Sequence, residues 1–271
     1  MYMDQPIGVI DSGVGGLTVA SELMRQLPKE KLIYLGDTLR CPYGPRPKEE
    51  VIKYTLEMVN FLREKKMKLL VIACNTATAF TLDILRETLD IPVIGVIEPG
   101  ARAAIKMTNN MNVGVIGTEG TIESKAYPAA LTSIHADLSV YDLACPKFVP
   151  LVEKGMFTGD EVYRVIEESL QPLKTIAEID TLILGCTHYP LLADTIQAVV
   201  GKDVMIISSG EETAREVSAI LGYQALLFEG ERHPEHEFYT TGSSDVFEQI
   251  TQQWLDITVN DVKKITISSN F

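Results

Sequence analysis

The chain has 271 residues, 46% hydrophobic and 23% charged, a composition that supports a packed core and excludes general disorder. Its formal net charge of −13, from 37 acidic and 24 basic residues, argues against nucleic-acid binding and against an anionic membrane surface. No apolar run approaches the roughly 20 residues of a membrane helix, and the first residues lack a signal-peptide pattern, so we expect a cytoplasmic protein.

Short apolar runs rich in β-branched residues alternate with longer amphipathic segments, which is typical of parallel α/β structure. In chain order, strands are predicted at Ile7–Ile10, Leu32–Leu35, Leu69–Ala73, Val93–Val96, Val113–Ile116, Leu138–Tyr141, Thr181–Leu184 and Val204–Ile207. Helices are predicted between them, for example at Lys48–Lys66 and Asp160–Ile176. Several strands are apolar throughout, so we expect helices on both faces of the sheets.

The first part of the chain is echoed in its middle part. Residues 7–13 resemble residues 113–119, and residues 69–76 resemble residues 181–188, in the same order and at nearly the same spacing. The echo predicts an α/β fold with two similar, pseudo-symmetric domains and mainly parallel sheets.

Turn-forming residues mark two crossings between these domains, near residues 98–100 and 208–210. The tail has no counterpart in the middle of the chain, so we expect it to return and complete the first domain. The first domain would then comprise residues 1–97 and 208–271, and the second domain residues 98–207.

Asp11 and Ser12 follow the first predicted strand and precede a glycine-rich run at residues 13–16. The spacing of that run fits neither a dinucleotide fingerprint nor a phosphate loop. We interpret it as a tight turn whose free backbone donors, with Ser12, hold a carboxylate, and a glycine turn without a ligand is the alternative. Asp11 could tune a nearby thiol or cap the following helix.

The four cysteines lie at positions 41, 74, 145 and 186 without a CxxC pair, which argues against disulfides and against structural zinc. Cys74 and Cys186 end equivalent strands of the echo, and hydrogen-bonding side chains follow each of them. Ligands of open α/β sheets bind at the carboxyl ends of the strands, so we expect these two thiols to face each other across an interdomain cleft. Cys41 and Cys145 are interpreted as packing residues.

Facing thiols suit inversion at carbon, because one thiolate can remove an α-proton while the opposite thiol protonates the other face. His188 lies two residues after Cys186, where an imidazolium would favour the thiolate, although a capping or core histidine is the alternative. The mixed polar run at residues 233–237 is interpreted as a solvated loop. We therefore predict no cofactor and no metal.

Four blocks, at residues 10–17, 36–46, 73–77 and 184–190, together resemble the aspartate/glutamate racemase family. They span most of the chain in the expected order. Leu39, where a smaller residue is expected, is the one departure.

The resemblance implies a two-domain fold with its site in the cleft, interconversion of L- and D-glutamate, and a supply of D-glutamate for peptidoglycan. It implies that Cys74 and Cys186 are the acid/base pair, and that Asp11, His188 and Glu153 support catalysis. The residues that would bind substrate are Asp11, Ser12, Tyr43, Gly44, Asn75, Thr76, Thr187 and His188. The expected partners are the small-molecule substrate and a second copy of the chain in a homodimer.

Three other functions stay open. A racemase of aspartate or another amino acid would use the same cysteines. A binding protein or regulator would keep the fold without turnover. A thiol redox or metal protein would use the cysteines as a disulfide, or as ligands together with His188.

Overall fold

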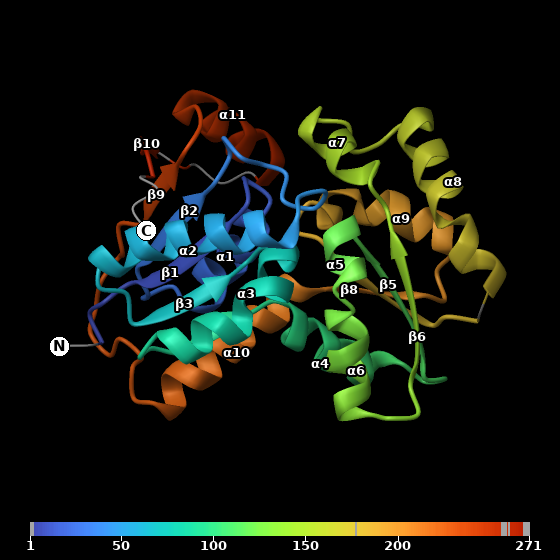
Figure 1. The fold of residues 1–271 in the computed structure, drawn as a ribbon, viewed down its shortest axis with the longest axis horizontal. Coiled ribbons are helices and arrows are strands. Elements are labelled where there is room, and N and C mark those ends of the chain that lie inside the picture. Colours follow the sequence, from blue (N-terminus) through green and yellow to red (C-terminus); the bar gives the residue numbers. More distant parts are fainter. Residues whose placement is uncertain (1–2, 177, 256–258, 260, 268–271) are drawn as a thin grey trace.

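Two parallel sheets form the two halves of the molecule in a computed structural model that describes residues 3–176, 178–255, 259 and 261–267 (Figure 1). The first sheet has the strand order β10-β9-β2-β1-β3-β4. Its strands are β1 (Ile7–Asp11), β2 (Leu32–Gly36), β3 (Leu69–Ile72), β4 (Val93–Gly95), β9 (Glu237–Thr240) and β10 (Lys263–Lys264). The second sheet has the order β6-β5-β7-β8. Its strands are β5 (Asn112–Gly117), β6 (Ser139–Ala144), β7 (Thr181–Gly185) and β8 (Met205–Ser208).

Helices cover both faces of each sheet (Figure 1). The helices of the first half are α1 (Leu17–Gln26), α2 (Lys48–Glu64), α3 (Asn75–Thr88), α10 (Ser209–Tyr223) and α11 (Ser244–Leu255). Those of the second half are α4 (Ile97–Met107), α5 (Glu119–Glu123), α6 (Ala126–Ile134), α7 (Phe148–Glu153), α8 (Asp160–Ile176), the short 3₁₀ helix η1 (Tyr189–Leu192) and α9 (Ala193–Val200). α10 packs against both α1 and α4, and so joins the halves.

Burial explains why the central strands are apolar along their whole length. On one face of the first sheet, Val71 of β3 belongs to a core with Leu23 of α1 and Val217 of α10. On the other face, Ile72 belongs to a core with Met58 of α2. All the residues of β3 are therefore buried, as expected of a parallel strand between two helical layers.

The two sheets share one topology, because β2-β1-β3-β4 and β6-β5-β7-β8 follow the same order. β1 and β5 occupy equivalent central positions, and so do β3 and β7. The sequence echo therefore relates strands that are equivalent in space. The α/β fold with two similar parallel sheets is confirmed, and α8 has the predicted bounds.

Some elements differ from the sequence prediction. The strand predicted at Leu138–Tyr141 is β6, which runs on to Ala144. β9 and β10 were not predicted, and Glu237, assigned to a solvated loop, begins β9. The first sheet takes its strands from residues 1–97 and 208–271. We retain those ranges, with residues 98–207, as the proposed domains.

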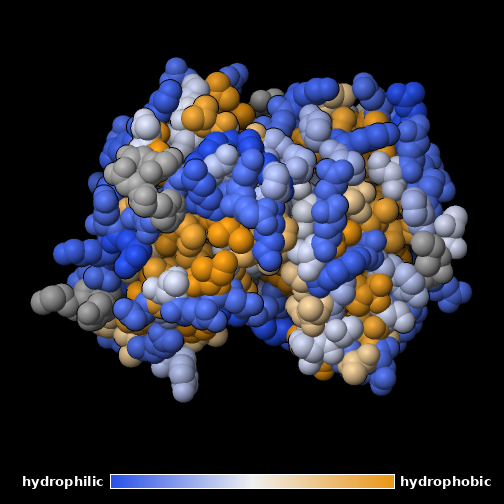
Figure 2. Space-filling view, viewed as in Figure 1, coloured by the Kyte–Doolittle hydropathy of each residue, from blue (hydrophilic) through white to orange (hydrophobic). Residues whose placement is uncertain are grey.

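The surface in the same view is mainly hydrophilic, with patches of hydrophobic residues between hydrophilic ones (Figure 2). Within the described part of the chain, no helix has both the length and the apolar character needed to span a bilayer.

Candidate active site

Cys74 lies directly after β3 and caps the first turn of α3. Its Sγ accepts a hydrogen bond from the Ala77 N–H, with 3.4 Å between sulfur and nitrogen. The thiol also lies 3.7 Å from the Ser12 Oγ, at the end of β1. With only 6% of the residue exposed, Cys74 is held at the carboxyl edge of the first sheet.

Cys186 occupies the equivalent place after β7 and is also 6% exposed. Its Sγ lies 3.9 Å from the Nδ1 of His188. The other ring nitrogen of His188, Nε2, lies 2.6 Å from Oε1 of Glu153 at the end of α7. The sequence reaches this geometry by a tight turn, in which the Tyr189 N–H donates to the Cys186 carbonyl.

Both cysteines line one small cavity between the halves. Its lining residues are Ser12, Pro42, Tyr43, Gly44, Cys74, Asn75, Thr76, Thr118, Val149, Gly185, Cys186, Thr187 and His188. The volume is about 20 Å³, which is close to what one water molecule needs. The structure thus places nine of the sequence-predicted residues on a single small cavity.

Asp11 and Glu153 do not line that cavity but contact residues that do. Asp11 is fully buried, and its carboxylate accepts hydrogen bonds from the Gly13 N–H at 2.9 Å and from the Thr187 hydroxyl at 3.4 Å. The second contact joins the two halves. Glu153 acts through His188, and its side chain remains 37% exposed.

The two thiols have unlike electrostatic surroundings. Burial, with the nearby Asp11 carboxylate, raises the pKa of Cys74 to about 12. Burial opposes the charged form of His188, but its hydrogen bonds to Cys186 and Glu153 raise its pKa to about 10. An imidazolium therefore sits beside Cys186, whereas a carboxyl group sits near Cys74.

The loop between β2 and α2 brings Tyr43 and Gly44 to the cavity. Asp37 fixes this loop, since its carboxylate accepts hydrogen bonds from the Tyr43 hydroxyl, from Arg40 Nε at 2.6 Å and from Thr241 at 2.8 Å. Tyr43 itself is 1% exposed. The buried Asp37 carboxylate thus fixes the position of the Tyr43 ring.

Backbone and hydroxyl contacts close the cavity from the second half. The Gly120 N–H donates to the Gly44 carbonyl at 2.9 Å. The Thr76 hydroxyl lies 2.8 Å from that of Thr118 and 3.0 Å from that of Thr121. Together these contacts hold the start of α5 against the start of α3.

Sequence reasoning missed Thr118, Thr121 and Tyr127. Thr118 had a signal, because the echo of residues 7–13 in residues 113–119 aligns it with Ser12. No sequence pattern marks Tyr127, whose hydroxyl donates to the Asn75 Oδ1 at 2.7 Å.

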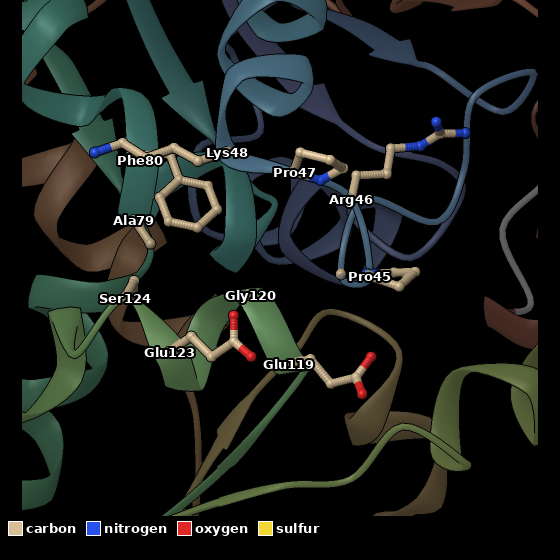
Figure 3. A pocket seen from close by; sticks show the side chains of 11 residues that line it. Pro45, Arg46, Pro47, Lys48, Ala79, Phe80, Glu119, Gly120, Glu123 and Ser124 are labelled. Atoms are coloured by element: carbon tan, nitrogen blue, oxygen red, sulfur yellow. The ribbon is translucent and has the colours of Figure 1, made fainter.

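A larger cavity of about 630 Å³ lies beside this site and shares Gly44 with it. Figure 3 shows Lys48, in the first turn of α2, on one side and Glu119 and Glu123 of α5 on the other. No thiol or imidazole lines it, so we place the chemistry in the smaller cavity despite its size. The larger one forms an outer hollow next to the Gly44 contact with Gly120.

The described residues include no group of three or more His, Cys, Asp or Glu side chains arranged to hold a metal ion. The side chains of the small cavity can donate hydrogen bonds and exchange protons. Two thiols from equivalent strand ends can reach a ligand between them from opposite halves, which is the requirement for proton removal on one face and delivery on the other.

Comparisons with known proteins identify the family and relatives of similar fold. The family model described as Asp/Glu/Hydantoin racemase matches residues 7–217. A glutamate racemase of Oceanobacillus iheyensis is 60% identical over 271 residues, covering 99% of both chains. A glutamate racemase isoform from Bacillus anthracis has a crystal structure with a TM-score of 0.94 and 52% identity, covering 97% of this chain and 98% of its own. The Francisella tularensis glutamate racemase, solved with D-glutamate, has a TM-score of 0.92 at 34% identity, covering 99% and 100%.

Proposed function

The chain belongs to the Asp/Glu/Hydantoin racemase family, and on this premise we propose that Cys74 and Cys186 interconvert L- and D-glutamate by two-base proton transfer without a cofactor. The observation that carries the mechanism is the position of both thiols on one small cavity, at the ends of equivalent strands. Glutamate as the substrate is supported by relatives that carry the name glutamate racemase at 56 to 60% identity.

In each direction, one thiolate takes the α-proton and the opposite thiol gives its own proton to the other face of the planar carbanion. The first cysteine ends as a thiol and the second as a thiolate, so the next turnover can run in reverse. His188 supports the thiolate of Cys186, and Glu153 in turn holds the imidazole. Asp11, which bonds to Thr187, would act on the Cys74 side.

Substrate binding in this proposal uses the donors that line the cavity. The set comprises the side chains of Ser12, Tyr43, Asn75, Thr76, Thr187 and His188 and the backbone of Gly44. Donors that face the α-carboxylate stabilise the charge that develops when the α-proton leaves, and the other donors hold the substrate in place. Closing the site also excludes water, which strengthens these interactions.

The product fits a supply of D-glutamate for peptidoglycan, and we propose that role, with a cytoplasmic location and a homodimeric assembly. The first two follow from the family resemblance. Sedimentation velocity tests the assembly, and a monomer at all concentrations would contradict a homodimer.

Circular dichroism of D-glutamate, L-glutamate and aspartate, each with purified protein and no added cofactor, tests the activity. We expect both glutamate enantiomers to lose their optical signal and aspartate to keep its own. Racemisation of aspartate alone would contradict the substrate. Glutamate that binds without exchanging its α-hydrogen in deuterated water would indicate a binding protein instead of an enzyme.

A further inference from the structure

The side-chain amide of Asn75 has a hydrogen-bond partner at its oxygen but not at its nitrogen, among the described residues. Asn75 is the first residue of α3, is 2% exposed and lines the cavity that holds both cysteines. Its Nδ2 is buried and makes no hydrogen bond to any residue in the described part of the chain. A buried donor without a partner is costly, so a ligand with an acceptor atom is the natural partner for this group.

The carbonyl end of the same amide has a partner from the other half of the molecule. The Tyr127 hydroxyl, on α6, lies 2.7 Å from the Asn75 Oδ1. Tyr127 is 1% exposed, and a Cβ added at Gly185 would lie 3.0 Å from its ring. The phenol ring therefore packs closely against the end of β7, directly before Cys186.

Ser209 also interacts with the Tyr127 hydroxyl. Burial raises the pKa of Tyr127, and the hydrogen bond with Ser209 opposes the rise, as a donor to the phenol oxygen does. Ser209 is the first residue of α10 and is 5% exposed. The phenol donates its one proton to the Asn75 Oδ1, which leaves its oxygen able to accept from Ser209.

We propose that Tyr127 is a positioning residue, which turns the Asn75 amide so that its N–H groups meet a carboxylate oxygen of bound glutamate. The inference rests on the proposed function. The part of the cavity beside the Asn75 amide then binds a hydrogen-bond acceptor and rejects an ammonium group. Because the bond joins α3 to α6, the amide is set only while the two halves are together.

Tyr127→Phe removes the hydroxyl and keeps the ring, so the amide becomes free to turn its oxygen toward the substrate. We expect KM for both glutamate enantiomers to rise about tenfold with kcat within about twofold, because the contact is made equally to substrate and transition state. Ser209→Ala should shift KM in the same direction by less. Tyr189→Phe is the matched control, since its buried hydroxyl donates to the Cys145 carbonyl at 3.0 Å, away from the amide.

A double-mutant cycle separates positioning from packing. In an Asn75→Ala background, Tyr127→Phe should raise KM no further, because no amide remains to be oriented. Where turnover is too slow, the dissociation constant of glutamate from calorimetry replaces KM, and thermal melting verifies that each variant is folded. If Tyr127→Phe does not fold, Ser209→Ala takes its place in the same cycle.

An unchanged KM, or an equal loss in both backgrounds, would overturn the positioning role while wild-type racemisation remains. A wild-type protein that neither racemises nor binds glutamate would instead overturn the proposed function, and the inference with it.

Discussion

Two chemically identical thiols occupy unlike surroundings, and that difference matters for a reaction that needs one acid and one base at a time. The pKa of Cys74 is raised to about 12 by burial and Asp11. Cys186 has the protonated His188 beside it. We therefore expect the resting site to hold a thiol at Cys74 and an imidazolium at His188, beside Cys186.

The raised pKa of His188 makes stability depend on pH. The value is about 10 in the folded protein, against 6.5 for a free histidine, so the folded state keeps a proton that the unfolded chain loses. Its contribution is complete below pH 6.5 and is lost as the pH rises to about 10. The free energy of unfolding, from urea titrations across this range, should fall by up to about 1.4 kcal/mol per pH unit for this one proton.

His188→Asn should flatten that decline, and Glu153→Gln should move its upper end to lower pH, because it weakens the hydrogen bond at Nε2. A decline of equal slope in wild type and His188→Asn would assign it to other groups.

Some residues of the candidate site could be predicted from the sequence, and others could not. Cys74 and Cys186 were predictable because each ends an apolar strand of an internal echo. Thr118 could have been found from the same echo. Tyr127 could not, because its contact with Asn75 arises when α6 of one half packs near α3 of the other, and no local pattern records that approach.

At the scale of elements, the site is assembled from strand ends and helix starts. Cys74 is the N-cap of α3 through its sulfur, and Thr118 is the N-cap of α5 through its hydroxyl. Residues that face the cavity therefore also begin helices. The strands that bring them there were predictable, since full burial imposes continuous apolar runs. β9 and β10 were not, because β10 is an edge strand made of Lys263 and Lys264, and β9, which lies next to it, begins with Glu237 in a polar run.

The start of α5 approaches the loop at Gly44 closely enough to exclude a side chain. A Cβ at Gly120 would lie 2.9 Å from the Gly44 carbonyl oxygen and 3.1 Å from the Thr76 Cγ2. Gly120→Ala should therefore push the halves apart at this point and lower kcat/KM by roughly tenfold or more, measured by circular dichroism in both directions.

Gly222→Ala is the control for that substitution. Gly222 lies in the last turn of α10, and the nearest atom to an added Cβ is 3.6 Å away. This change should raise the free energy of unfolding by about 0.5 kcal/mol and leave activity unchanged. Full activity in Gly120→Ala would show that the contact is not needed for turnover.

For the whole molecule, the small volume of the site implies motion. A cavity of about 20 Å³ cannot admit an amino acid, so the side chains, the loops or the two halves around it must move for binding and release. The hydrogen bonds that join the halves here, and so resist their separation, include the Gly120 bond to Gly44 and the Thr187 bond to Asp11. The division into two halves was predictable from the echo, whereas the closed state depends on contacts between distant residues.

Alkylation of the four thiols measures this closure. Cys74 and Cys186 are buried on the small cavity, whereas Cys41 lines a different one and is partly exposed. Peptide mass mapping after iodoacetamide should show that glutamate slows labelling of Cys74 and Cys186 several-fold, with Cys41 as the internal control. Equal rates with and without glutamate would place the ligand elsewhere.

The central claim is that each cysteine serves one face of the α-carbon. It is tested with both enantiomers of a glutamate analogue that carries a leaving group on the β-carbon. A thiolate removes the α-proton, the bond to the leaving group breaks with its electron pair, and the resulting enamine hydrolyses to a keto acid and ammonium. This elimination needs one base and no proton delivery to the opposite face.

Release of keto acid from the analogue, followed for Cys74→Ser and Cys186→Ser, is the decisive measurement. Each variant should process one enantiomer and fail with the other, with opposite preferences, because a serine hydroxyl is far too weak a base to replace the missing thiolate. If both variants lose the same enantiomer, or both retain it, the two thiols do not act on opposite faces.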